Sequence, residues 1–315
     1  MVESRLIAGF DAGQTHTSCR LAWLTDSATL VPCGEGQGPG VSHLGAPGGP
    51  ERFEAALLQS LQAAGLPAGR NLSAAGIGAS GIEAGSSVER QGQALAARCL
   101  QLPSDRVWVS GDEVAALGGA LGLAPGVLVI SGTGCIALGR NGAGQTHRCS
   151  GWGWLLDGAG SAMDIGRDGL MLSVQMADGR LPESALRTQL WSALGIQSAQ
   201  ELKAKVVASD FGPAGFAQLA PLVDGQAAAG DPRAQAVIER SATALAQMVS
   251  TIQRKLQLQE PAICGVGGAL SHLRTLRRAF ETELHRLCPD AHWQEPAGDA
   301  CDGALQQAAQ AALRC

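Results

Sequence analysis

Aromatic and basic residues are scarce in this chain. Of its 315 residues only 3% are aromatic, and there is no tyrosine. Lysines and arginines form no cluster, and the formal net charge is −5. Proteins that bind nucleic acid usually present a basic patch together with aromatic side chains that stack on bases. The composition therefore argues against nucleic acid as a partner.

Paired metal-binding patterns are missing as well. The nine cysteines include no C-x-x-C pair and the six histidines include no H-x-x-x-H pair, so a zinc cage is not expected. An odd number of unpaired cysteines is typical of reduced thiols in the cytoplasm. The opening residues, "MVESRLIAGF", lack the basic and apolar regions of a signal peptide. We expect a cytoplasmic protein.

Charged residues are absent from segment 114–139, which is long enough to span a bilayer. Several glycines and Pro125 interrupt this segment, and Ser131 and Thr133 add polar side chains. We interpret it as a buried helix, a loop and a strand, and we expect no membrane partner.

Glycine, by contrast, is abundant: 43 residues fall in clusters between apolar runs. Strand-like and helical segments alternate, which predicts an α/β fold with a largely parallel sheet. A strand, a glycine-rich turn and a second strand occur at the start and again over 127–142, which indicates two related halves. We place one domain at 1–119 and a second at 120–301. The C-terminal helix, about 302–315, is expected to pack back on the first domain.

Three other segments give local predictions. Apolar residues recur at helical spacing over 51–64, which predicts an amphipathic helix. Glycine and proline dominate 34–50, which predicts a loop. Asp231 followed by Pro232 predicts a helix that begins at that point.

Three glycine-rich turns follow apolar strands: "DAGQTHT" (11–17), "SGTG" (131–134) and "GVGGA" (265–269). Backbone N–H groups in such turns bind anions. Any single turn could be purely structural, but three turns, two of them in matching positions, favour a phosphate site. The Walker pattern G-x-x-x-x-G-K-[ST] is absent, and no Rossmann fingerprint follows the first strand.

These motifs resemble those of the actin, Hsp70 and sugar-kinase superfamily. "GFDAGQTHTS" is similar to its first phosphate motif, "VLVISGTG" to its second and "ICGVGGALS" to its adenosine motif. "CSGWGWLLDGAGSAMDIGRDGL" (149–170) is similar to the N-acetylglucosamine kinase branch, the BadF/BadG/BcrA/BcrD ATPase family. The resemblance covers nearly the whole chain. It implies an actin-like ATPase fold: two ribonuclease-H-like domains with a nucleotide cleft between them.

The resemblance also implies an activity. An ATP-dependent carbohydrate kinase, a phosphotransferase, would phosphorylate an amino sugar such as N-acetylglucosamine, with Mg²⁺ and as a homodimer. Asp11 would position Mg²⁺, and Asp112 would be the general base. Asp112 could instead cap a helix, and Glu113 is the alternative candidate for the general base. Nucleotide contacts are implied for Gly13, Gln14, Thr15, His16, Gly132, Thr133, Gly134, Gly267 and Gly268.

Departures from the family pattern cluster where the sugar would bind. The family has an Asn soon after a Gly-Pro pair, but this chain has "GPGVSH", with Val41 or Ser42 there. The family's G-T-G-S is "GTGC", and its G-D-E-G-S is "DGAGS". Trp152 could stack on a sugar or belong to the core, and Asp157 could replace the missing acid or cap a turn. The expected substrate contacts are Ser80, Gly81, Cys135, Trp152 and Asp157.

Two alternative functions remain open. A non-catalytic sugar or nucleotide sensor fits the altered sugar motifs, although Asp112 argues against it. An ATPase activator of the BadF type would need cysteines that hold an iron–sulfur cluster, and the nine cysteines do not resemble that ligand set. The Asp112→Asn change distinguishes a kinase from a protein without catalysis.

Overall fold

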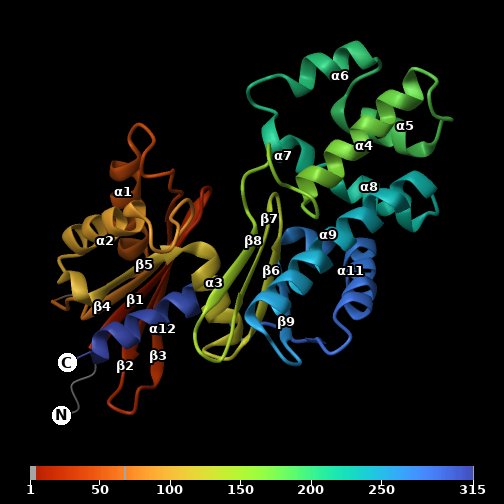
Figure 1. Ribbon diagram of the computed structural model, residues 1–315. Coiled ribbons are helices and arrows are strands. Elements are labelled where there is room, and N and C mark those ends of the chain that lie inside the picture. Colours follow the sequence, from red (N-terminus) through yellow and green to blue (C-terminus); the bar gives the residue numbers. More distant parts are fainter. Residues whose placement is uncertain (1–4, 67–68, 315) are drawn as a thin grey trace. The chain divides into compact units, whose positions relative to one another are not determined.

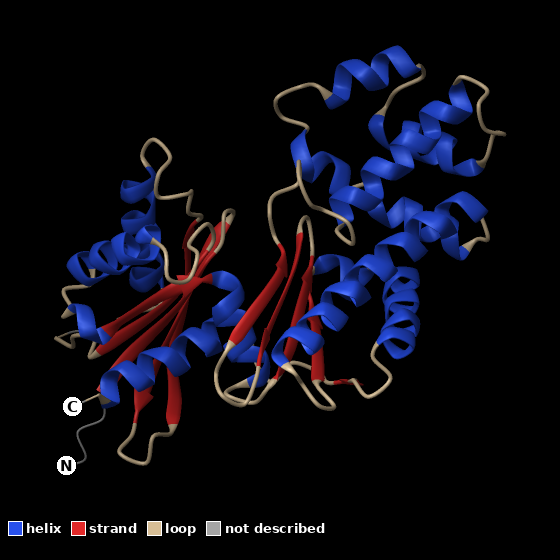
Figure 2. Cartoon of the chain, in the orientation of Figure 1, coloured by secondary structure: helices blue, strands red, loops and turns tan. Residues whose placement is uncertain are grey.

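Two mixed five-stranded sheets, each packed against helices, make up the protein (Figures 1 and 2). The computed structural model describes residues 5–66 and 69–314. Residues 1–4, which begin the segment without signal-peptide features, lie outside the described residues, as does Cys315. Contacts divide the chain into a first unit, Met1–Leu123 with Pro296–Cys315, and a second unit, Ala124–Glu295. Residues 120–123 and 296–301 thus belong to the first unit, although the sequence analysis assigned them to the second domain.

The first unit combines three antiparallel strands with two parallel strands that follow helices. Its strands are β1 (Arg5–Ala12), β2 (His16–Leu24), β3 (Leu30–Pro39), β4 (Ala74–Ala79) and β5 (Val107–Gly111). Its helices are α1 (Gly49–Ala63), α2 (Ser87–Cys99), the 3-10 helix η1 (Ser104–Arg106), α3 (Asp112–Leu121) and α12 (Ala300–Leu313).

Side chains of β1 alternate between the two faces of the first sheet, whose strand order is β3-β2-β1-β4-β5. Leu6 and Phe10 share a core with Phe53 of α1. Ile7 points to the opposite face of the sheet, where it packs with Leu305 of α12. The predicted amphipathic helix over 51–64 is confirmed by α1, whose apolar side chains are buried.

The prediction of a loop over 34–50 is wrong for residues 34–39, which form the second half of β3. Gly34, Gly36 and Gly38 alternate along this strand, and each faces the backbone of α1 or of Ala64, which follows it. A Cβ on Gly38 would come within 2.8 Å of the backbone nitrogen of Ser60. The glycines are therefore present because a helix lies directly on the strand, and they do not indicate a loop.

Helix α12 approaches the same sheet even more closely. A Cβ on Gly9 of β1 would lie 2.6 Å from the carbonyl oxygen of Cys301, and a Cβ on Gly76 of β4 would collide with the carbonyl of Ala304. On the helix itself, a Cβ on Gly303 would collide with the carbonyl of Ala115 in α3. Backbone thus meets backbone on both sides of α12.

The second unit repeats the strand arrangement and carries more helices. Its strands are β6 (Gly126–Ser131), β7 (Cys135–Arg140), β8 (Thr146–Ser150), β9 (Ala262–Val266) and β10 (His292–Trp293). Its helices are α4 (Ala162–Ala177), α5 (Ala185–Leu194), α6 (Ala199–Val206), α7 (Gly212–Ala217), α8 (Ala220–Ala228), α9 (Pro232–Leu256), α10 (Gly268–His272) and α11 (Arg274–Leu287).

The predicted relation between the two halves is confirmed by the strand order of the second sheet, β10-β9-β6-β7-β8. Its first strand, β6, lies antiparallel to β7 and parallel to β9, just as β1 lies antiparallel to β2 and parallel to β4. Helix α9 begins as predicted, because the Asp231 carboxylate accepts the N–H groups of Arg233 and Ala234.

Segment 114–139 forms most of α3, a connection, β6 and the first part of β7, as the sequence indicates. Within the described ranges, no helix combines the length and the apolar character that a membrane span requires. The cysteines of those ranges are free thiols, five of them buried.

We predict that Gly76→Ala destabilises the first unit by about 1–3 kcal/mol or more, because the new methyl group meets the backbone of α12. Gly225→Ala is the matched control. Gly225 is exposed on α8 with no heavy atom near its virtual Cβ, so alanine there should stabilise by about 0.5–1 kcal/mol. Differential scanning calorimetry of the two variants measures both effects. Equal melting temperatures for Gly76→Ala and the parent would contradict the close contact.

Candidate functional site

The candidate site residues of the first unit lie at the carboxyl edge of its parallel strands. Ala12 of β1 pairs with Ala79 of β4, and Ala79 pairs with Gly111 of β5. The residues that follow these strands, Ser80 and Asp112, therefore emerge at one edge of the sheet. Ligands of open α/β sheets bind at this edge.

The turn between β1 and β2 is closed by a hydrogen bond from the Gly13 N–H to the His16 carbonyl, 3.1 Å. Gln14, Thr15 and His16 are exposed. The Val41 N–H donates to the Gly13 carbonyl at 2.9 Å, so the segment after β3 lies against this turn. The predicted phosphate-binding turn is thus held at its base, while its tip faces solvent.

Asp11 sits in an acidic environment. Its carboxyl is mostly buried, and burial is the largest cause that raises its pKa from 3.8 to about 6. The carboxylates of Asp112 and Asp299 raise this pKa further, whereas His16 lowers it. The structure therefore brings Asp11 and Asp112 into electrostatic contact, and a cation beside them would relieve their repulsion.

Asp299 is a neighbour of Asp11 that the sequence analysis missed. A cavity of about 360 Å³ is lined by Asp11, Arg20 and Asp299, among others. The Arg20 guanidinium donates to both carboxylate oxygens of Asp299, at 2.9 and 3.0 Å, and also pairs with Asp302. The sequence does carry a sign of this residue. Residues 299–302 have the pattern D-x-x-D, which forms a capping box at the start of α12.

Asp112 is the first residue of α3 and follows β5 directly. Its Oδ1 accepts the N–H of Glu113 at 3.0 Å, and its side chain is half-buried. Glu113 is buried within the first turn of α3. A carboxylate with one oxygen fixed at a strand end has the rigidity that a general base requires.

Ser80 and Gly81 follow β4. The Ser80 N–H donates to the Ala12 carbonyl at 2.9 Å, and Gly81 has a left-handed φ of 80°. A Cβ on Gly81 would lie 3.3 Å from the His43 ring, so this turn adjoins the segment after β3. In that segment Ser42 Oγ is buried and has no hydrogen-bond partner among the described residues. A bound hydroxyl group would satisfy it.

The two glycine-rich turns of the second unit meet at one cavity. Gly132, Thr133 and Gly268 line a space of about 440 Å³ whose other walls are mainly alanine and other small or apolar residues. Gly267 has a φ of 95°, and a Cβ there would collide with the Ser131 carbonyl. Thr133 and Gly134 are exposed at the tip of their turn. Small residues around glycine turns leave room for a flat ring and a phosphate chain.

Cys135 and Asp157 lie close together in the second unit. Cys135 is buried, and its thiol donates to the Ala159 carbonyl at 3.2 Å. Burial raises the pKa of this thiol to about 11, and the Asp157 and Asp164 carboxylates add to that rise. Trp152 is 62% exposed, which excludes the core alternative, and the Arg148 guanidinium covers its ring at 4.5 Å.

The described residues fit a nucleotide with a magnesium ion. No group of three His, Cys, Asp or Glu side chains in the described part of the chain is arranged as a metal cage. Magnesium needs no such cage, because it takes one or two carboxylates and completes its shell with water and phosphate oxygens. A divalent cation beside Asp11 would offset the burial and the neighbouring carboxylates that raise its pKa.

Sheet order and glycine turns together define the class of protein. Two units with the strand order 3-2-1-4-5 give the chain the actin-like ATPase fold. The chain belongs to the BadF/BadG/BcrA/BcrD ATPase family, whose model matches residues 8–296. The fold and the family predicted from the sequence are confirmed.

Relatives with assigned activities are similar to parts of the chain. An N-acetylmuramic acid/N-acetylglucosamine kinase of Clostridium acetobutylicum is 26% identical over 202 residues, which cover 64% of this chain and 66% of that protein. An N-acetyl-D-glucosamine kinase of Dictyostelium discoideum is 33% identical over 158 residues, 48% of each chain. The chain thus spans about half to two thirds of the length of these curated relatives.

A solved structure is similar over nearly the full length. It is a protein of Chromobacterium violaceum, provisionally assigned as an N-acetylglucosamine kinase, with 28% identity and a TM-score of 0.73. The match covers 97% of this chain and 99% of that one.

The acidic environment of Asp11 predicts a pH-dependent stability. Between pH 3.8 and about 6 the folded chain holds a proton on Asp11 that the unfolded chain releases. The wild-type protein therefore loses stability as pH rises through this window. Without metal, Asp11→Asn should raise the free energy of unfolding by about 1–3 kcal/mol at pH 7.5 and by much less at pH 4.

Asp26→Asn, at an exposed turn of the same unit, controls for the loss of one carboxylate. Thermal unfolding of the three proteins in chelator at both pH values measures the difference. An Asp11→Asn protein that is no more stable than wild type at pH 7.5 would show that Asp11 is not under electrostatic strain.

Proposed function

We propose that the chain is an ATP-dependent kinase that phosphorylates an amino sugar, N-acetylglucosamine or a close analogue, with Asp112 as general base. The observation that carries this proposal is the cavity shared by the second phosphate turn and the adenosine turn, Gly132 and Thr133 with Gly268. The named activities of the similar proteins support the substrate class. Mg²⁺ as the metal, a homodimeric state and a cytoplasmic location belong to the same proposal.

Each unit contributes one set of nucleotide contacts in this proposal. In the second unit, backbone groups at Gly132, Thr133 and Gly134 bind phosphate oxygens, and Gly267 and Gly268 allow adenosine to lie against the backbone. In the first unit, the turn from Gly13 to His16 offers backbone and side-chain donors to phosphates. Bound ATP supplies the phosphoryl group that is transferred.

Asp11 and Asp112 have different roles in the proposed reaction. Asp11 holds the metal, because a bound cation would stabilise its carboxylate and lower its raised pKa again. Asp112 accepts the proton of the attacking sugar hydroxyl, which is the part that a carboxylate plays in phosphoryl transfer beside the positioning and charge stabilisation that the nucleotide site supplies. The hydrogen bond from the Glu113 N–H holds the Asp112 carboxylate in place.

Sugar specificity in this proposal comes from the altered motifs together with the retained candidates Ser80 and Trp152. Ser42 and Ser80 of the first unit offer hydroxyl groups, and the unpartnered Ser42 Oγ supports a polar ligand there. In the second unit, the proposed sugar contacts Cys135, Trp152 and Asp157 lie in or next to the altered motifs. A thiol in place of a hydroxyl weakens one hydrogen bond, so the preferred sugar should differ from that of relatives with serine.

A non-catalytic sensor is the second candidate function. The buried thiol of Cys135 stands where the family carries a hydroxyl, and Val41 or Ser42 stands where it carries an Asn, which favours a changed ligand. The exposed Trp152 lies outside the core, and a ligand that stacks on its ring would use the face that the Arg148 guanidinium leaves open. A sensor would bind nucleotide or sugar without turnover.

We predict that Asp112→Asn lowers sugar-dependent ADP release by about 10²- to 10⁴-fold, because the base is lost while the shape is kept. Binding of Mg-ATP should remain within a few-fold of wild type. The assay is coupled ADP release with a panel of hexoses and amino sugars, together with calorimetric titration of nucleotide.

Glu113→Gln is the matched control, since the neighbouring carboxylate becomes an amide in the same way. A larger loss in Glu113→Gln than in Asp112→Asn would transfer the role of base to Glu113. A folded, ATP-binding wild-type protein that releases no ADP with any sugar would overturn the kinase and favour the sensor.

A further inference from the structure

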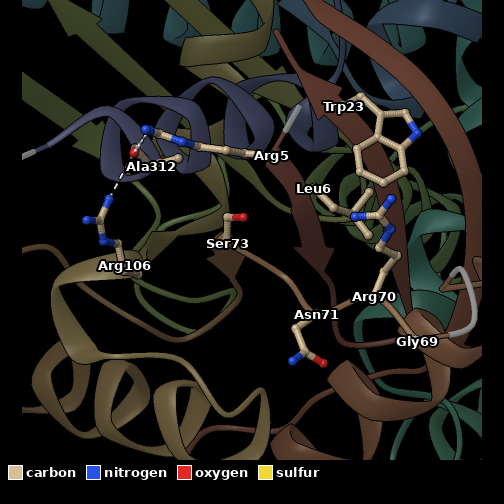
Figure 3. A pocket seen from close by; sticks show the side chains of 9 residues that line it. All are labelled: Arg5, Leu6, Trp23, Gly69, Arg70, Asn71, Ser73, Arg106 and Ala312. Atoms are coloured by element: carbon tan, nitrogen blue, oxygen red, sulfur yellow. Dashed lines mark hydrogen bonds between the residues drawn. The ribbon is translucent and has the colours of Figure 1, made fainter. Parts of the chain in front are cut away.

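An open cavity of about 500 Å³ lies in the first unit at the end of the sheet opposite Asp11 (Figure 3). Arg5 begins β1 and lines this cavity, whereas Asp11 lies near the end of the same strand. The two positions are six steps apart along the strand, which corresponds to roughly 20 Å. The cavity therefore shares no residue with the nucleotide or sugar contacts proposed above.

Three arginines line this cavity, and none of the described residues that line it is acidic. Arg106 Nη1 donates to the Ala311 carbonyl at 3.0 Å. It also donates to the Ala312 carbonyl at 2.8 Å, and Arg5 donates to the same carbonyl (Figure 3). Both guanidiniums are thus anchored at the carbonyl end of α12. A guanidinium has five N–H donors, so each anchored arginine keeps donors for a ligand.

Arg70, the third arginine, is exposed and lies over Trp23, with its Cζ 5.7 Å from the ring centroid. Asn71 and Ser73, on the connection that leads into β4, add an amide and a hydroxyl to the lining. The backbone N–H of Ser73 donates to the Leu6 carbonyl at 2.7 Å, which ties this connection to β1. Figure 3 shows these polar side chains arranged around one space.

We propose that this cavity is a second binding site, for a small phosphate ester such as a sugar phosphate. Three guanidiniums concentrate positive charge in a chain whose net charge is −5. Arginine binds phosphate oxygens through paired N–H donors, and a phosphomonoester carries close to two negative charges at neutral pH. The cavity has a volume typical of small-molecule sites, far more than one phosphate group fills. The amide and the hydroxyl suit the hydroxyl groups of a sugar.

Isothermal titration calorimetry of the full chain, without nucleotide or metal, tests this site. The probes are N-acetylglucosamine 6-phosphate, inorganic phosphate and unphosphorylated N-acetylglucosamine. We expect the ester to bind most tightly, inorganic phosphate more weakly and the plain sugar not detectably. Arg70→Ala should weaken binding of the ester at least tenfold, because Arg70 holds no helix end in place.

Arg90→Ala is the charge-matched control: Arg90 is exposed on α2 and does not line the cavity. It should change ester affinity by less than twofold. Asn71→Ala provides a second variant, with an expected loss of at least threefold. Titration of indole fluorescence should show an ester-induced change in wild type that is lost in Trp23→Phe.

Three results would overturn the proposal. These are no saturable binding of the ester, binding of inorganic phosphate alone, and ester binding that Arg70→Ala and Asn71→Ala leave unchanged. The last result would place the ester elsewhere, for example at the proposed catalytic site. None of these measurements requires turnover, so the site can fail or stand independently of the proposed kinase activity.

Discussion

The contact between the backbone of α12 and the first sheet is the constraint on which the first unit depends. Gly9 and Gly76 leave no side chain between the sheet and the helix, and Gly303 removes one between α12 and α3. Helix and sheet normally stay apart by the thickness of their side chains. Here the glycines allow a much closer approach, so each of them is specified by sterics and any larger residue is excluded.

This close contact also fixes what surrounds Asp11. Because α12 is held against β1 and β4, its first turn delivers Asp299 to the neighbourhood of Asp11, where Arg20 binds Asp299 through both of its oxygens. Arg20 compensates Asp299 but not Asp11, whose pKa stays raised. The acidic character of the site is therefore a property of the packed unit rather than of the β1–β2 turn alone.

Much of the fold follows from patterns that neighbouring residues carry. The first strand, the helical spacing in α1 and the Asp231-Pro232 start of α9 are local features, and each is found where it was predicted. Family resemblance also identified the turns around Gly132 and Gly268, which line one cavity. The roles of these residues, and of Asp112, stay predictions, since a role depends on ligands as well as on position.

The features that the sequence did not predict depend on contacts between segments that lie far apart in the chain. Gly34, Gly36 and Gly38 resemble loop residues until one knows that a helix lies on them, and that helix begins only at Gly49. The sequence could not place Asp299 beside Asp11, because 287 residues separate the two. They come together only because α12, which Asp299 caps, packs on the first sheet. Ser42 was noted as a departure from a family pattern, but its buried and unpartnered hydroxyl became visible only in three dimensions.

The return of α12 to the first unit has a consequence for synthesis on the ribosome. The segment Ala124–Glu295 is translated in full before Pro296–Cys315, so the second unit has all its residues while the first still lacks a helix. During that interval the glycine-lined face of the first sheet, with Ile7 and Ala74 around it, has no cover. The order in which the units complete their folding is then the reverse of the order in which their synthesis begins, and the first unit exposes apolar surface for longer than the second.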